Sequence, residues 1–88
     1  MTTKEILARF DEIERTRRIT LADIEVLDVE FLIPAVIGRY EKCGQYYVSV
    51  AARDGKLPYP FIRSGNRTKI PKAAYIEFHK GLLKGERL

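Results

Sequence analysis

The sequence predicts a small α+β domain, and three features lead to this expectation. The chain has 88 residues, of which 45% are hydrophobic, so it can fill one modest core but is too short for a TIM barrel, a kinase or a two-domain dinucleotide enzyme. Apolar residues recur at helical spacing in several segments. Between these helical segments, a proline-rich stretch and a Gly-Asn pair flank shorter runs that are typical of strands.

The charge is unevenly distributed along the chain. Residues 1–33 contain five basic and eight acidic side chains, whereas residues 34–88 contain eleven basic and four acidic ones, although the net charge is only +4. A C-terminal part this basic favours a polyanionic ligand, because each lysine or arginine that neutralises a phosphate releases counterions. The alternative interpretation is an ordinary surface that is rich in lysine and arginine.

A first helix is predicted over residues 3–16. Thr2 and Glu5 have the spacing of a capping box, and apolar side chains then recur on one helical face. These side chains are Ile6, Leu7, Phe10 and Ile13. Such a stripe either covers the core of its own domain, which is the commoner arrangement, or faces a partner chain.

The segment after this helix has a mixed pattern. Thr20 and Asp23 have the spacing of a helix cap, which favours a short helical turn near residues 20–27. The alternation of polar and apolar residues from Asp28 onward favours a short strand near 29–33.

Two short helices in the middle of the chain predict a helix-turn-helix. Pro34 suits the first position of a helix because it has no N–H group to leave unpaired, and the apolar spacing extends this helix to about residue 42. Cys43 and Gly44 interrupt it with a tight glycine turn, and a second helix is predicted over 45–53. Its expected buried residues are Val48, Ala51 and Ala52, of which the two small ones allow a close crossing.

A β-hairpin is predicted after the second of these helices. Gly55 is expected to cap that helix in a left-handed conformation, and the Pro-Tyr-Pro segment at 58–60 forms an extended entry. Strands are then expected at 61–63 and 67–70, with a turn between them at 64–66. Alternation in the second strand places Arg67 and Lys69 on the outer face, with Thr68 and Ile70 facing the helices.

A final helix is predicted over residues 72–83, directly after Pro71. The residues expected to close the core from this helix are Ala74, Ile76, Phe78 and Leu82. The chain from residue 84 to 88 is expected to be frayed.

These elements together predict a winged helix-turn-helix with an additional N-terminal helix, which is a fold suited to duplex DNA. The major groove admits one helix, and a basic hairpin can lie along the backbone or in the minor groove. The residues expected to contact DNA are Gln45, Tyr46, Tyr47, Ser49, Arg53, Lys56, Arg63, Asn66, Arg67 and Lys69. The alternative is a winged helix that binds another protein.

Enzymatic, metal and cofactor chemistry is not indicated by the sequence. His79 is the only histidine and falls within the last predicted helix, where a structural role is far commoner than general-base catalysis. Cys43 is the only cysteine, which excludes an intrachain disulfide and favours the cytoplasm, and we expect it to be a small buried turn residue. No apolar run approaches the roughly 18 residues of a membrane helix. We therefore expect a non-enzymatic cytoplasmic protein without cofactor, metal or membrane.

The order of the motifs resembles a known family. A proline-started helix and short turn are followed by a second helix that ends in Asp-Gly-Lys-Leu-Pro, and then by a Gly-Asn-Arg hairpin and an Ile-Pro pair. Over residues 31–81 this order is similar to the small winged helix of phage and mobile-element excisionases, AlpA-type regulators and MerR-like DNA-binding domains. The resemblance implies sequence-directed DNA binding, with the second helix in the major groove and the hairpin in the minor groove. It also implies several copies that bend DNA and steer an integrase or a promoter.

The sequence departs from the family at three positions of the second helix. Val50 stands where the family often has a basic residue, and Tyr46 and Tyr47 replace small hydroxyl residues. Aromatic side chains near positive charge can stack on exposed bases, so binding to single-stranded DNA is an alternative.

We therefore expect a DNA-binding accessory factor of a mobile element, which directs recombination or bends DNA with an integrase as partner. One alternative is a transcriptional regulator with the same contacts, and another is a protein-interaction or single-strand-binding subunit of a replication complex. The expected organisation is an acidic helical extension at 1–30, the winged helix at 31–83 and the frayed end at 84–88. The extension has the charge to dock a partner protein or a second copy.

Overall fold

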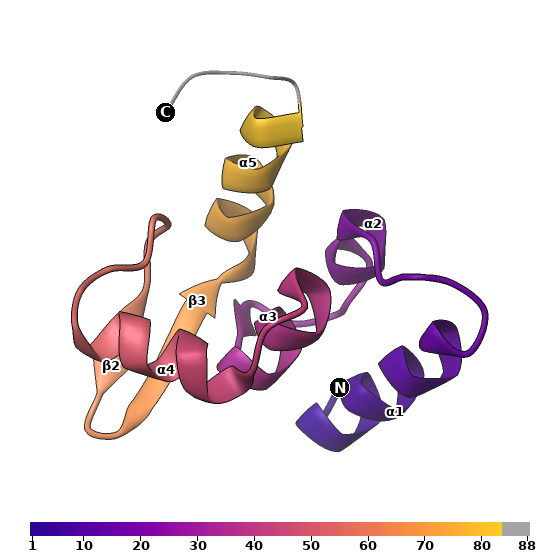
Figure 1. Ribbon diagram of the computed structural model, residues 1–88, viewed down its shortest axis with the longest axis horizontal. Helices are drawn as coiled ribbons and strands as arrows, with labels where there is room; N and C mark the ends of the chain where they lie inside the picture. The colour runs from indigo at the N-terminus through magenta and orange to yellow at the C-terminus, as the bar shows by residue number, and fades with distance from the viewer. Residues whose placement is uncertain (84–88) are drawn as a thin grey trace.

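The computed structural model describes residues 1–83, and within them the chain forms five helices and one three-stranded antiparallel sheet (Figure 1). The elements in chain order are α1 (Thr3–Glu14), α2 (Leu21–Glu25), β1 (Phe31–Leu32), α3 (Pro34–Glu41), α4 (Gln45–Arg53), β2 (Ile62–Ser64), β3 (Arg67–Pro71) and α5 (Lys72–Leu83). The sheet order is β1-β3-β2. The predicted α+β class is confirmed, while the frayed end predicted at 84–88 lies outside the described residues.

The capping box predicted for α1 is present. The Thr2 hydroxyl oxygen accepts a hydrogen bond from the Glu5 N–H at 3.2 Å, and the Glu5 carboxylate accepts one from the Thr2 N–H at 2.7 Å. Ile6 and Phe10 are buried in the hydrophobic core that other elements of the domain also form. Leu7 and Ile13 are half-buried against that core. Of the two arrangements that the sequence allowed for this stripe, the helix adopts the one that covers its own core.

The segment from α2 to β1 is fastened to the start of α5. The Asp23 carboxylate accepts a hydrogen bond from the Thr20 N–H at 2.7 Å, which is half of the predicted cap of α2. The Lys72 ammonium group donates to the carbonyl oxygens of Glu25 and Leu27, at 3.0 and 2.6 Å. These carbonyls lie at or just beyond the C-terminal end of α2, where a positive charge is favourable. The short strand near 29–33 is confirmed as β1, which pairs with β3 through Leu32 and Ile70.

The turn between α3 and α4 differs in detail from the prediction. The residue in the left-handed conformation is Lys42, with a φ of 62°, whereas Gly44 is extended and caps the N-terminus of α4. The glycine that the turn requires is Gly38, within α3. A Cβ atom at Gly38 would lie 2.7 Å from the Cys43 carbonyl oxygen, so any side chain there would push the turn away from the helix.

The hairpin of β2 and β3 has a two-residue loop. Arg63 pairs with Thr68 and Ser64 with Arg67, so the loop is Gly65-Asn66, and Gly65 adopts the positive φ of 61° that a tight hairpin turn requires at its first position. Thr68 and Ile70 are buried while Arg67 and Lys69 are exposed, as the alternation predicts. The predicted left-handed Gly55 after α4 is also present, with a φ of 69°.

The prediction for the core face of α5 is wrong at one end. Tyr75 and Ile76 are buried and Ala74 and Phe78 half-buried, but Leu82 is 40% exposed. Tyr75, which the sequence prediction left out, is the largest fully buried side chain. The sequence does not predict its burial, because a buried tyrosine hydroxyl needs a hydrogen-bond partner, which here is distant in the chain.

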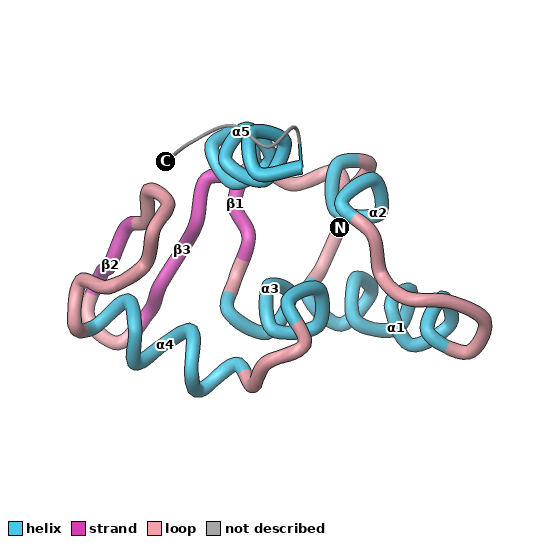
Figure 2. The backbone as a smooth tube through the Cα atoms, turned by 45° about the horizontal axis from the view of Figure 1, so that its top comes forward, coloured by secondary structure: helices cyan, strands magenta, loops and turns pink. Residues whose placement is uncertain are grey.

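The two ends of the molecule differ in what they contain. Figures 1 and 2 show α4 and the β2–β3 hairpin side by side at one end, and α1 with α2 at the other. Helix α3 lies between them and β1 and β3 run up towards α5 (Figure 2). The acidic N-terminal segment is therefore placed away from the basic hairpin.

Candidate nucleic-acid interface

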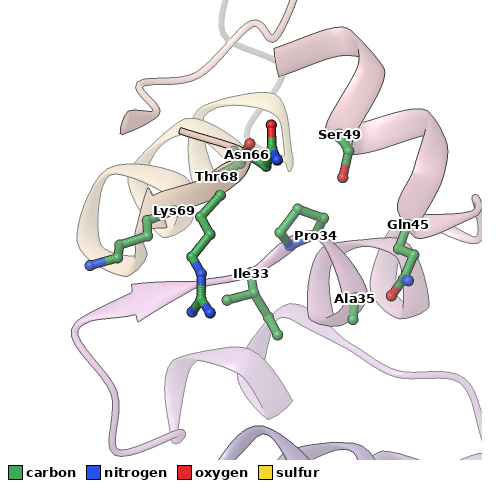
Figure 3. A pocket seen from close by; sticks show the side chains of 9 residues that line it. Ile33, Pro34, Ala35, Gln45, Ser49, Asn66, Thr68 and Lys69 are labelled. Atoms are coloured by element: carbon green, nitrogen blue, oxygen red, sulfur yellow. The ribbon is translucent and has the colours of Figure 1, made fainter. Parts of the chain in front are cut away.

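A groove of about 290 Å³ separates α4 from the hairpin (Figure 3). Its floor consists of Ile33, Pro34 and Ala35, where β1 passes into α3. The hydrophilic side chains that line it come from both walls and are Gln45 and Ser49 on α4 and Asn66, Arg67, Thr68 and Lys69 on the hairpin. Figure 3 shows Gln45 and Ser49 on the side of α4 that faces this groove. The groove thus combines an apolar floor with neutral polar and cationic walls.

A second, smaller hollow of about 180 Å³ continues this surface along α4. Ser49 and Asn66 line both hollows, and Tyr46, Arg53 and Arg63 are added in the second. We call the combined surface the α4–hairpin face. Its members are Gln45, Tyr46, Ser49, Arg53, Arg63, Asn66, Arg67 and Lys69. Eight of the ten residues predicted to contact DNA therefore lie on one continuous surface.

The polar groups of this face are largely uncommitted. Within residues 1–83, the side chains of Gln45, Ser49 and Asn66 make no hydrogen bond, and Arg67 makes neither a hydrogen bond nor an ion pair. The Lys69 ammonium group lies 5.4 Å from the centre of the Phe31 ring, an exposed cation–π contact that a ligand can replace at small cost.

The remaining cations of the face have weak internal partners. Arg63 donates to the Gly65 carbonyl oxygen at 3.2 Å and so helps to shape the loop. This contact uses only one guanidinium nitrogen, so the others remain available to a ligand. Arg53 lies 3.4 Å from Asp54, in an exposed pair that is worth little to stability. Asp54 is the only acidic residue between positions 45 and 71, which contain five basic ones. The field over this face is therefore positive.

The structure does not bring Tyr47 and Lys56 to the α4–hairpin face. Both line a separate hollow of about 340 Å³, whose walls come from α4, the loop before β2, and α5. Its apolar lining includes Leu57, Phe78 and Leu82. Tyr46 and Tyr47 are adjacent on a helix, so their side chains point about 100° apart, and only Tyr46 can share a surface with Ser49 and Arg53.

A partly buried polar cluster that the sequence does not predict lies next to this hollow. The Glu41 carboxylate accepts hydrogen bonds from the hydroxyl groups of Tyr75 at 2.5 Å and Tyr59 at 3.5 Å. Burial, reinforced by Glu41, raises the pKa of both tyrosines well above the usual value, so both stay neutral. The cluster satisfies polar groups that would otherwise be unpaired in the core.

His79 and Cys43 lie near this cluster. The ring of His79 packs edge-on against Tyr40 and Phe78, and burial lowers the pKa of His79 more than the nearby Glu41 raises it. Cys43 lies at the turn after α3, as predicted, but it is half-buried rather than buried, and this burial raises the pKa of its thiol. A thiol with a raised pKa is a poor nucleophile at neutral pH.

Other lines of evidence do not point to a different site. Within residues 1–83, no helix is both long and apolar enough to cross a membrane, and no three His, Cys, Asp or Glu side chains are grouped to hold a metal ion. Comparison of the chain with protein-family models, curated proteins and solved structures gave no match. The functional inference therefore depends on the geometry and charge of the α4–hairpin face.

Proposed function

We propose that the protein is a winged helix-turn-helix that binds duplex DNA through the α4–hairpin face. The observation that carries this proposal is the groove in which uncommitted amide and hydroxyl groups are flanked by the cations of the hairpin. Helix α4 would enter the major groove, which is wide enough for one helix. Arg63, Arg67 and Lys69 would contact phosphates or the wall of the neighbouring minor groove.

The distribution of charge supports this orientation on DNA. The acidic residues of α1 are held at the other end of the molecule, so they do not oppose the approach of a polyanion to the hairpin (Figure 1). Neither α4 nor the hairpin contains an acidic residue, and the nearest carboxylate along the chain, Asp54, is paired with Arg53. A long-range field of this kind also accelerates association.

We further propose a non-enzymatic role as an accessory factor of a mobile element. This part rests on the order of motifs between residues 31 and 81, which resembles that of excisionases and related regulators. Such a factor acts by placing itself on DNA, and by bending the duplex or recruiting a recombinase. A transcriptional regulator would use the same contacts, so the two roles differ in the partner rather than in the DNA-binding face.

The DNA-binding proposal is tested by titrating a labelled duplex with the full chain at about 50 mM and about 200 mM salt. If the three hairpin cations neutralise three phosphates, the affinity should fall roughly 40-fold between these conditions. A single strand of the same sequence measures the alternative of single-strand binding. Absence of binding to the duplex at the lower salt concentration would refute the proposal, whether or not the single strand is bound.

A second candidate function is protein binding at the hollow beside Tyr47. Tyr47 is 67% exposed and Leu82 40%, so this hollow presents apolar surface outside the DNA-binding face. Replacing Tyr47 by Ser distinguishes the two functions, because the substitution should leave affinity for duplex DNA unchanged. A large loss of DNA affinity in this variant would place the hollow in the nucleic-acid interface instead.

A further inference from the structure

The polar side chains of α4 form a regular stripe that faces the hairpin. Gln45, Ser49 and Arg53 are spaced by four residues, so they lie on the same side of the nine-residue helix. The groove and the hollow next to it confirm this placement, since Gln45 and Ser49 line the first and Ser49 and Arg53 the second. An amide, a hydroxyl and a guanidinium group thus lie in a row along one side of the helix.

The chemistry of these groups matches different bases. The amide of a glutamine pairs with N6 and N7 of adenine through two hydrogen bonds, and the guanidinium group of an arginine pairs with O6 and N7 of guanine. A serine hydroxyl pairs with several base edges and discriminates little. Gln45 makes no side-chain hydrogen bond within residues 1–83, and the exposed contact of Arg53 to Asp54 at 3.4 Å is weak enough to exchange for a base.

The length of the stripe sets the spacing between the two bases. Gln45 and Arg53 are eight residues apart, which is about 12 Å along a helix that rises about 1.5 Å per residue. Base pairs are stacked about 3.4 Å apart, so a helix that follows the groove would place the two contacts about three to four base pairs from each other.

From this arrangement we infer that α4 selects duplex sites in which an adenine, contacted by Gln45, and a guanine, contacted by Arg53, lie about three to four base pairs apart. The inference deepens the proposed function and rests on it. The cations of the hairpin supply affinity without reading sequence, whereas the stripe on α4 supplies the selectivity. Each bidentate pairing should favour its base roughly 5- to 150-fold over the others.

The experiment is a binding selection with the full chain from a pool of duplexes that carry a randomised segment. The wild-type protein should enrich an adenine and a guanine at the stated spacing. Gln45→Glu is nearly isosteric but can only accept hydrogen bonds, so it loses the donor that pairs with the N7 acceptor of adenine. It should instead prefer cytosine, which presents only the N4 donor in the major groove. Arg53→Ala should remove the preference for guanine and leave the adenine position intact.

A matched control separates this inference from the proposed function. Arg67→Ala should lower the recovery of all sequences together and leave the selected pattern unchanged. If the wild-type protein binds the pool but enriches no pattern, or if Gln45→Glu retains the wild-type adenine, the inference is wrong while DNA binding stands. If the wild-type protein retains no duplex at all, the proposed function itself is wrong.

Discussion

The two ends of the molecule use their charged side chains differently. At the α1–α2 end, acidic and basic groups are paired across elements: Arg39 of α3 contacts Asp11 and Glu14 of α1, and Lys80 of α5 lies 2.9 Å from Glu25 of α2. Arg17 is also paired there, with Asp23 at 2.8 Å. At the α4–hairpin end, Arg63, Arg67 and Lys69 have no ion-pair partner within residues 1–83.

This difference separates groups that hold the fold from groups that are free for a ligand. The charge pairs link α1 to α3 and α2 to α5, and a ligand would have to break those pairs to use their charges. The hairpin cations Arg63, Arg67 and Lys69 have no ion pair to break within residues 1–83, so a ligand could use them at little cost to the fold. Substitutions at the two ends should therefore affect different properties of the protein.

The largest effect is expected from Phe10→Ala at the α1 end. Phe10 is fully buried in the core, and its truncation should cost about 3–5 kcal/mol, much of the stability of a small domain. Thermal unfolding followed by circular dichroism measures this loss. The exposed neighbour Arg9 offers a control, because Arg9→Ala should leave the melting temperature nearly unchanged. Equal melting temperatures for Phe10→Ala and the wild-type protein would show that α1 does not complete the core.

The next effect is expected at the other end, from the double substitution of Arg67 and Lys69 by Ala. If each side chain neutralises one phosphate, the slope of log affinity against log salt should become shallower by about 1.8. Thermal stability should stay close to that of the wild-type protein, because both side chains are exposed. The matched control removes two charges from α1, Lys4 and Arg9, which are also exposed. If the control weakened DNA binding as much as the hairpin variant does, the loss of affinity would be due to net charge and not to contacts of the hairpin.

A smaller effect is expected from Arg39→Ala. Its Nε and Nη2 atoms lie 3.0 and 2.5 Å from the same oxygen of Glu14, in a partly exposed contact whose loss should cost about 1 kcal/mol. Chemical denaturation measures this difference, and affinity for duplex DNA should not change. Arg15→Ala provides the comparison, since its contact with Glu12 at 3.4 Å is largely exposed and should contribute almost nothing. A larger loss of stability in Arg15→Ala than in Arg39→Ala would contradict the stabilising role of the charge pair between α1 and α3.

The smallest effect is a pH dependence due to His79. Burial holds the pKa of His79 below its ordinary 6.5, so the unfolded chain takes up a proton more readily than the folded protein does. The stability present at neutral pH should therefore decrease as the pH falls below about 6.5. His79→Gln should remove this part of the dependence, as measured by melting temperatures across that range. A wild-type protein that becomes more stable on acidification through this range, relative to the variant, would contradict the assignment.

Much of the fold follows from local sequence signals. Thr2 with Glu5, the proline at position 34, and the glycines at 55 and 65 each fix a helix end or a turn through interactions within a few residues. The exposed and buried faces of β3 follow from simple alternation. Such features are predictable because the residues that determine them are neighbours in the chain.

What the sequence could not predict depends on distant partners. The hydroxyl group of the buried Tyr75 bonds the carboxylate of Glu41, 34 residues away, and Arg39 pairs with Asp11 and Glu14 of the distant helix α1. For the candidate site, helical spacing correctly groups Gln45, Ser49 and Arg53, but it does not say which side of α4 the hairpin covers. The placement of Tyr47 and Lys56 in a different hollow follows from that tertiary contact.

DNA binding through the α4–hairpin face is tested most directly by titrating the ¹⁵N-labelled protein with duplex DNA and following the amide chemical shifts. If this face binds the duplex, shifts should be concentrated in α4 between Gln45 and Arg53 and in the hairpin between Ile62 and Lys69, with α1 and α2 unaffected. Shifts centred on α1, or on the hollow lined by Tyr47 and Phe78, would contradict it.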